Sequence, residues 1–318
     1  MLEEIIAERK KKLEKLREAG INPYPATVGK TIPIGEVLKN FSKLASGKKK
    51  VSISGRITAN RDIGNIVFFK IADESGVMQA VLKKDTTADF KLWRDTLDRG
   101  DFVKITGPVF STKTKEKSVE AKTVVILTKS LRPLPTEYFG LEDEDARLRE
   151  RYVDLILDPS LRDLFRKKSS FWAAIRDFLR AQKFTEVETG VLEPIPGGAE
   201  AEPFITHHNA LDADFYLRIS LELPLKRLIV GGFERVFEIG RIFRNEGISR
   251  EHLQDYTQME FYWANHDYRD LMQMLPKMYR AAVKAATGGK LETTFQGKTI
   301  NWGGVWPTID YCDAFKKA

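Results

Sequence analysis

A charged stretch in the second half of the chain holds the side chains best suited to chemistry. Arg244 and Glu246 lie two residues apart, and Tyr256, Glu260 and Tyr262 follow at spacings of four and two. Residues at such spacings in a β-strand point to one face of a sheet. An arginine fork suits a phosphate, a tyrosine ring suits stacking on a purine, and carboxylates suit an amine. The pattern predicts a site for a nucleotide beside a small cationic molecule; the alternative is a surface hairpin crossed by salt bridges.

The segment that carries these residues resembles motif 2 of the class II aminoacyl-tRNA synthetases, a Phe-Arg-x-Glu hairpin that embraces ATP. Its variant, Arg-Asn-Glu-Gly-Ile-Ser at 244–249 with Thr-Gln-Met-Glu at 257–260, is similar to that of the lysyl-tRNA synthetases. Further blocks of the same resemblance lie at 196–199, 203–211 and 225–234, and in the first half at 55–57, 112–114 and 127–135. The resemblance covers nearly the whole chain, from the first helix to about Trp306.

The resemblance implies an ATP site on the hairpin. Arg244, the residue that we expect to act in catalysis, matches the arginine that holds the α-phosphate of ATP and steadies the adenylate. A cation suits this position because charge gathers on the α-phosphate when the lysine carboxylate attacks it. Tyr256 stands where the family usually has a phenylalanine stacked on adenine. Glu246 and His252 match residues around the nucleotide.

The resemblance also implies a pocket for L-lysine, which a lysine–tRNA ligase joins to tRNA-Lys. Glu222, Glu260 and Tyr262 match the residues that accept the lysine side chain with its ammonium, and Gly198 matches a glycine loop beside the amino acid. Buried carboxylates are costly unless paired, so such a site demands a cation. An aspartate- or asparagine-type synthetase shares the architecture, but an aspartate pocket needs basic groups, whereas Glu222 and Glu260 make this one acidic. Lysyl transferases that act on a translation factor resemble the catalytic domain but lack the barrel, which argues against them.

The first half of the chain predicts a small β-barrel. Strand-like runs lie at 51–59, 65–72, 77–82, 102–109 and 118–127, with a helical stretch at 89–98 between the third and the fourth. This is the order of an OB-fold, which binds oligonucleotides on one face. Aromatic rings for stacking and polar groups for base edges suit that face, although some of the rings must fill the barrel: Arg56, Arg61, Phe68, Phe69 and Gln79.

Charge supports a nucleic-acid partner for the same half. Residues 1–135 hold 27 Lys and Arg against 16 Asp and Glu, and residues 136–318 hold 25 against 29. A basic front half favours contact with a polyanion such as tRNA, and solubility is the alternative reading. The resemblance implies that Arg61, Phe68, Gln79 and Glu116 read the anticodon. For the basic amphipathic helix predicted at 2–18, we expect packing on the surface of the protein in preference to RNA binding.

The second half predicts an α+β domain with a mostly antiparallel sheet, which the resemblance identifies as a class II catalytic domain. A helix that begins at Asp158-Pro159 has an apolar face wide enough for a core or a dimer seam, and the resemblance implies a homodimer. Gly190 stands where motif 1 usually has a proline, and we expect this glycine to loosen the dimer seam. The predicted organisation is a basic helix and linker at 1–50, the barrel at 51–135 and the catalytic domain at 136–318.

One family feature is missing from the sequence, the glycine-rich motif 3 that ends in an arginine. We therefore expect a catalytic domain that is incomplete at its C-terminus, with ATP and Mg²⁺ as cofactors, the Mg²⁺ ligands beyond residue 318 and no metal held within this chain. We expect a lysine–tRNA ligase whose chain has little activity alone; the alternative is a non-enzymatic RNA-binding synthetase remnant. A single cysteine and the lack of an apolar run near about 18 residues favour a cytoplasmic protein without a membrane span.

Overall fold

The structure is a computed structural model, which describes residues 2–47, 49–135, 143–247, 249 and 252–317. The chain divides into two compact units, Met1–Leu157 and Asp158–Ala318. Each unit has a hydrophobic core of its own. The predicted β-barrel lies in the first unit and the predicted α+β arrangement in the second.

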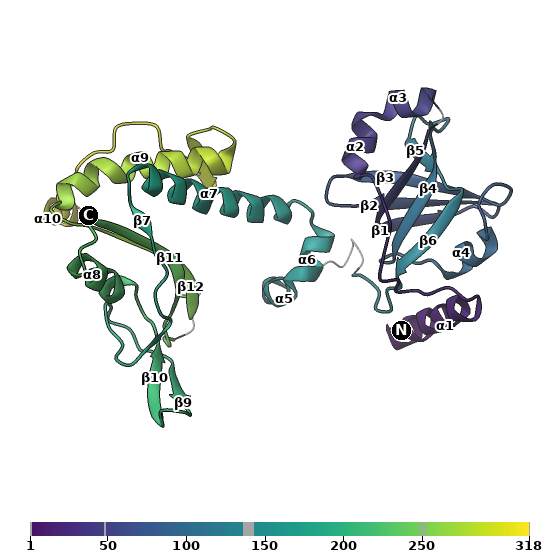
Figure 1. The fold of residues 1–318 in the computed structure, drawn as a ribbon. Helices are drawn as coiled ribbons and strands as arrows, with labels where there is room; N and C mark the ends of the chain where they lie inside the picture. The colour runs from purple at the N-terminus through teal and green to yellow at the C-terminus, as the bar shows by residue number, and fades with distance from the viewer. Residues whose placement is uncertain (1, 48, 136–142, 248, 250–251, 318) are drawn as a thin grey trace. The chain divides into compact units, whose positions relative to one another are not determined.

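A closed β-barrel forms the centre of the first unit (Figure 1). Its strands are β1 (Lys50–Asp62), β2 (Ile66–Ala72), β3 (Val77–Lys83), β4 (Phe102–Ser111), β5 (Lys117–Glu120) and β6 (Thr123–Thr128). The strands pair in the order β1-β2-β3-β5-β4-β6, and an additional β1–β4 pairing closes the barrel. The predicted run at 118–127 forms two strands instead of one. The strand is interrupted at 121–122 because β5 pairs with β3 and with the end of β4, whereas β6 pairs with the beginning of β4.

Alternating burial along the strands builds the barrel core. In β1, every second residue from Val51 to Ile57 is buried, as expected for a strand with one face on a core. Phe69 of β2 is only 1% exposed and is among the largest side chains in this core. At Gly107 of β4, a side chain would overlap the carbonyl group of Glu120. Only glycine therefore lets β4 pass so close to the turn between β5 and β6.

Short helices pack around the barrel, namely α1 (Leu2–Glu18), α2 (Ile34–Lys39), α3 (Phe41–Ser46) and α4 (Phe90–Thr96). The helices predicted at 2–18 and 89–98 are confirmed as α1 and α4. The helices α2 and α3 lie in the stretch predicted to be a linker, and they place Ile34, Val37 and Phe41 in the core. Helices of six residues are too short to produce a recognisable helical period in the sequence.

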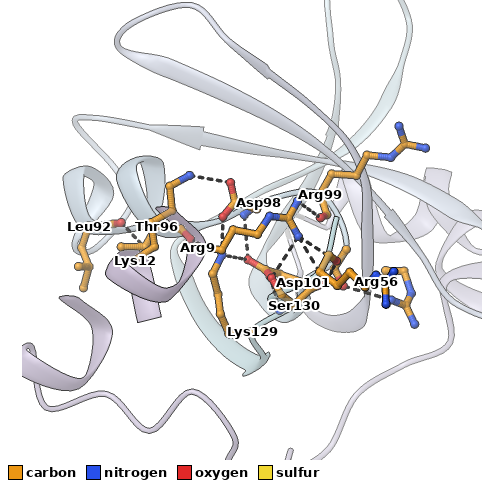
Figure 2. A network of polar contacts seen from close by, with 12 residues as sticks. Arg9, Lys12, Arg56, Leu92, Thr96, Asp98, Arg99, Asp101, Lys129 and Ser130 are labelled. Carbon is orange, nitrogen blue, oxygen red and sulfur yellow. Dashed lines mark hydrogen bonds and ion pairs between the residues drawn. The ribbon is translucent and has the colours of Figure 1, made fainter. Parts of the chain in front are cut away.

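A buried ionic network holds α1 against the barrel (Figure 2). The side chain of Lys129 is fully buried, and its Nζ lies 2.6 Å from Asp98 and 2.8 Å from Asp101. From α1, Lys12 lies 2.6 Å from the other oxygen of Asp98, and Arg9 donates hydrogen bonds to backbone carbonyl groups beside the network. Burial raises the pKa of Asp98, but hydrogen bonds from Lys12 and Lys129 outweigh it and hold the pKa below its usual value. These α1 cations therefore serve packing.

The second unit is built on a hairpin of β11 (Arg235–Phe243) and β12 (Asp255–Trp263), with β7 (Thr185–Glu186) parallel to β11. The helices α7 (Leu161–Ala181) and α9 (Tyr268–Thr287) run side by side and pack on one face around Phe237 (Figure 1). The helix α8 (Glu222–Val230) packs with Val236 and Ile242, which point to the other face. Because side chains alternate along a strand, the even-numbered residues of both strands share the face of α8.

The remaining elements are short. A second sheet of the unit has the order β8 (Leu192–Glu193), β10 (Ala213–Leu217), β9 (Ile205–His208), and a separate hairpin joins β13 (Glu292–Phe295) to β14 (Lys298–Asn301). The first unit ends with α5 (Glu144–Arg149) and α6 (Arg151–Leu157), and the second ends with α10 (Tyr311–Lys317). Residues 136–142, with which the predicted catalytic domain begins, lie outside the described residues. In the part of the chain that is described, no helix is long and apolar enough to cross a membrane.

Candidate active site and nucleic-acid interface

A buried ion pair supports the face of the hairpin that α8 covers. Arg218, directly after β10, lies 2.6 Å from Glu238 of β11, and the two side chains are 4% and 3% exposed. Arg218 also donates to the backbone oxygen of Arg241 at 2.8 Å, and Glu238 accepts hydrogen bonds from the N–H and the hydroxyl of Thr189. Such bonds offset the cost of removing two charges from water. The pair fixes the chain after β10 to the hairpin, and the sequence reasoning did not find it.

Glu260 lies directly opposite Glu238 in the β11–β12 pairing. One of its carboxylate oxygens accepts hydrogen bonds from the Ser220 hydroxyl at 2.8 Å, from the Leu221 N–H at 3.0 Å and from the side-chain amide of Gln258. All three donors are neutral. They orient the carboxylate and bring no positive charge to it, so the site keeps its attraction for a cation.

Ser220 connects three of the residues predicted for the lysine pocket. Its hydroxyl donates to Glu260 and accepts the backbone N–H of Glu222 at 3.1 Å. Gly198 has a left-handed φ of +88°, and a Cβ there would lie only 3.0 Å from the side chains of Ser220 and Glu222. The glycine loop therefore packs closely against the start of α8. Sequence reasoning missed Ser220, because it lies one position before Leu221, the N-cap residue of α8, where the capping preference for serine does not apply.

Tyr262, the fourth residue predicted for this pocket, interacts electrostatically with both carboxylates. Burial, with the charges of Glu260 and Glu222, raises the pKa of its hydroxyl to about 12. Glu222 already has a cationic partner from α8, because Lys226 Nζ lies 2.6 Å from its Oε1 and 6.0 Å from the centre of the Tyr262 ring. The structure thus brings Gly198, Glu222, Glu260 and Tyr262 into one acidic cluster.

The guanidinium of Arg244 lies on the same face, at the end of β11. Its Cζ is 5.7 Å from the centre of the Tyr256 ring, and its Nε donates to the backbone oxygen of Ile219 at 3.3 Å. The next residue, Asn245, donates its N–H to the carbonyl oxygen of Glu202 at 2.7 Å. The segment after β10 therefore links the two groups of residues. Its Ile219 holds the half-buried Arg244 beside the Tyr256 ring, and its Leu221 contacts Glu260 of the acidic cluster.

The loop between β11 and β12 holds the other two residues predicted to surround the nucleotide. His252 is exposed, and its Nδ1 lies 2.7 Å from the hydroxyl of Ser249, while Glu246 is half-buried. Among the described residues, no hydrogen bond or ion pair joins either of them to Arg244 or Tyr256. Residues 248, 250 and 251 of this loop lie outside the described residues. Nor does any group of three His, Cys, Asp or Glu in the described ranges have the arrangement of a metal site.

A groove of about 650 Å³ lies on the barrel, and three of the four predicted anticodon residues line it. Arg61 pairs with Phe68 across β1 and β2, and Gln79 of β3 pairs with Lys70, so their side chains point to one face. Glu116 is not among the lining residues of the groove. It lies in the turn before β5, a turn whose earlier residues do line the groove.

The groove also contains residues that sequence reasoning missed. Phe110 of β4 lines it together with Lys70, Lys83 and Lys113, and Lys83 Nζ lies 5.4 Å from the centre of the Phe110 ring. Phe110 pairs with Ser118 of β5, and Ser118 pairs with Gln79 of β3. The groove therefore has two aromatic rings, one on β2 and one on β4, with cations between and beside them.

Two further candidates for the binding face serve the fold. Phe69 reaches the floor of the groove, but it is 1% exposed and belongs to the barrel core. Arg56 stacks over Phe102 with its Cζ 4.3 Å from the ring centre, and it donates to the backbone oxygen of Gly100 at 3.2 Å. These contacts occupy the guanidinium that the sequence suggested for base edges.

The first unit is a barrel with a basic groove, and the second is an α+β unit with an acidic cluster beside an arginine. These are the features expected of a class II aminoacyl-tRNA synthetase, and comparison with known proteins gives the same class. Residues 143–318 match the tRNA synthetases of class II (D, K and N), and residues 51–127 match the OB-fold nucleic acid binding domain. The first match covers more than half of the chain. The chain therefore belongs to the class II tRNA synthetases of the D, K and N group, and the predicted fold class is confirmed.

Similar curated proteins carry the name lysine–tRNA ligase. The protein of Roseiflexus castenholzii is 46% identical over 311 residues, which are 97% of this chain and 63% of the relative. The protein of Magnetococcus marinus is 42% identical over 315 residues, with the same shares. That of Dehalococcoides mccartyi (strain 195) is 44% identical over 317 residues, 98% of this chain and 63% of the relative. The chain thus spans somewhat less than two thirds of the length of these relatives.

Proposed function

We propose that the protein to which this chain belongs is a lysine–tRNA ligase, which activates L-lysine with ATP and transfers it to tRNA-Lys. The acidic cluster of Gly198, Glu222, Glu260 and Tyr262 carries this proposal. Two carboxylates in a partly buried pocket favour a substrate that brings ammonium groups, because an unpaired charge there is costly. Aspartate would add a third carboxylate and asparagine a neutral amide, so within the D, K and N group the pocket favours lysine.

In the proposed reaction, the carboxylates hold the ammonium groups of lysine, and Arg244 binds the α-phosphate that the lysine carboxylate attacks. The new bond forms as the bond between the α- and β-phosphates breaks, and pyrophosphate leaves. A guanidinium already fixed beside this site stabilises the charge that develops on the phosphate. Tyr256 stacks on adenine, and Glu246 and His252 border the nucleotide. Mg²⁺, when bound, neutralises the β- and γ-phosphates. We assign it no ligand among the described residues.

We propose that the barrel groove binds the anticodon of tRNA-Lys. The ring of Phe68 offers a stacking surface, and Arg61 and Gln79 offer donors for base edges. Glu116 contributes from the turn at the edge of the groove. Phe110 supplies a second ring that the sequence reasoning did not include.

We further propose that the protein acts as a homodimer in the cytoplasm. On α7, Leu164 and Phe165 are 60% and 52% exposed, whereas the helix packs against α9 only from Phe171 onward. An exposed apolar stripe on a long helix suits a seam with a second copy.

Equilibrium binding of amino acids to the chain tests the proposed substrate. We expect L-lysine to bind in preference to L-aspartate and L-asparagine by at least about tenfold, as measured by isothermal titration calorimetry. Preference for aspartate or asparagine would contradict the proposal. Binding of RNA without binding of any of the three amino acids would favour the non-enzymatic alternative.

Binding of an anticodon stem-loop of tRNA-Lys tests the groove. Phe68→Ala should weaken it by about five- to a hundredfold, because base stacking on an aromatic ring contributes about 1–3 kcal/mol. Lys70→Gln should weaken it and reduce its salt dependence. Lys91→Gln, the same charge change on α4 outside the groove, is the matched control. Equal effects of the two lysine variants would leave only a non-specific basic surface.

A further inference from the structure

Lys226 places a primary ammonium group inside the pocket proposed for lysine. It lies one helical turn after Glu222 in α8, a spacing that brings two side chains together on a helix surface. Its Nζ is 2.6 Å from the Glu222 carboxylate and 6.0 Å from the centre of the Tyr262 ring. The chain thus fills part of the pocket with the same chemical group that the substrate would bring.

The two partners of this ion pair differ in how firmly they are held. Glu222 is fixed at its backbone by the hydrogen bond to Ser220 and at its Cβ by Gly198, and its side chain is 33% exposed. The side chain of Lys226 is 53% exposed, and four flexible carbons separate its ammonium from the backbone. The base of the Glu222 side chain is therefore anchored, while the lysine ammonium can move into solvent.

We propose that Lys226 is a resident counter-ion of Glu222, which the side-chain ammonium of the incoming lysine must displace. This inference rests on the proposed function. In the empty pocket, Lys226 offsets the repulsion between the carboxylates of Glu222 and Glu260. On binding, the ligand ammonium exchanges one ion pair for another, so affinity is lower than an unpaired carboxylate would give. A ligand without a side-chain ammonium has nothing to offer in return for the lost pair, so it gains nothing from Glu222.

The consequence is that removal of the Lys226 charge should tighten lysine binding. A partly exposed ion pair of this kind changes a binding constant by about two- to fivefold. Lys226→Gln should therefore bind L-lysine about two- to fivefold more tightly than the unchanged chain. Lys226→Arg keeps the positive charge and should stay within about twofold. Lys277→Gln, the same charge change on an exposed position of α9, should have no effect.

Calorimetric titration of the whole chain with L-lysine and with norleucine, which lacks the side-chain ammonium, provides the test. We expect a lower Kd for lysine in Lys226→Gln and a preference for lysine over norleucine that is at least as large as in the unchanged chain, with neither quantity changed in Lys277→Gln. Unchanged or weaker lysine binding in Lys226→Gln, with preference for lysine retained, would overturn the role of Lys226 and leave the proposed function standing. Equal binding of lysine and norleucine by the unchanged chain would instead contradict the proposed function, and this inference with it.

Discussion

Replacing Glu260 by Gln removes one negative charge from the acidic cluster and keeps the shape of the side chain. In the structure, the Ser220 hydroxyl, the Leu221 N–H and the Gln258 amide all donate to the same oxygen of Glu260. The amide oxygen of Gln can take that position and accept the same bonds. The fold should therefore lose about 1 kcal/mol or less in free energy of unfolding.

Lysine binding should lose far more. A hydrogen bond between an ammonium and a carboxylate contributes about 1.5–3 kcal/mol, and the amide group of Gln would turn a donor toward the ammonium. At about 1.4 kcal/mol for each factor of ten, the affinity for lysine should fall by about ten- to a hundredfold. Binding of ATP should change by less than about threefold, because Arg244 is held through Ile219 and stacks on Tyr256 without a contact to Glu260.

Calorimetric titrations with L-lysine and with ATP, run beside thermal unfolding, measure all three quantities. Glu234→Gln makes the same charge change at an exposed position before β11 and is the matched control. The reasoning would be refuted if Glu260→Gln bound lysine as tightly as the control. It would also be refuted if the variant lost several kcal/mol of stability, since the carboxylate would then be a structural group.

Gly240→Ala should destabilise the second unit by about 2–4 kcal/mol, because its methyl group would overlap the arginine of the buried ion pair. Gly247→Ala, with open space around it, should change the free energy of unfolding by less than about 0.5 kcal/mol, and similar melting curves for the two variants would contradict this packing. Lys129→Met should cost the first unit about 3–5 kcal/mol in urea unfolding, since the buried Asp101 loses its cation and Asp98 keeps only Lys12; a loss below about 1 kcal/mol would contradict it. The pKa of Tyr262, about 12, should fall in Glu260→Gln in a spectrophotometric titration, and an unchanged value would place the hydroxyl outside the field of that carboxylate. Because the pKa of Tyr262 in the folded chain lies above the usual value near 10, the folded chain holds this proton more tightly than the unfolded chain does. The free energy of unfolding should therefore fall as the pH rises from about 10 to about 12.

The face of the hairpin that carries the proposed chemistry could be predicted from the sequence, because strand alternation is a local property. Arg244, Tyr256, Glu260 and Tyr262 have even numbers and point to the face of α8, whereas Phe237 points to α7 and α9. Periodicity alone fixes this division once both strands are recognised. The grouping of Arg61, Phe68 and Gln79 in one groove follows in the same way from the β1–β2 and β2–β3 pairing.

The groups that position the site could not be predicted, because their partners are distant in the sequence. Arg218 meets Glu238 after a loop, a helix and part of a strand, and Ser220 meets Glu260 from 40 positions away. Neither pairing leaves a local pattern. Lys226 differs, since it lies four residues after Glu222 on the same helix, a local spacing that favours an ion pair. The short helices α2 and α3 were not predicted because six residues show no period.

Amino-acid-dependent exchange between ATP and pyrophosphate tests most directly the claim that this chain supplies a lysine-activating site. The chain matches 63% of the Roseiflexus castenholzii lysine–tRNA ligase, so it can replace the matching part of that protein in a chimera of the relative's full length. The unmodified relative and a chimera with Glu260→Gln serve as controls. We predict exchange that depends on L-lysine and is lost or greatly weakened in the variant, without a response to L-aspartate or L-asparagine. Exchange driven by aspartate or asparagine, or lysine-dependent exchange that is indifferent to Glu260→Gln, would contradict the account.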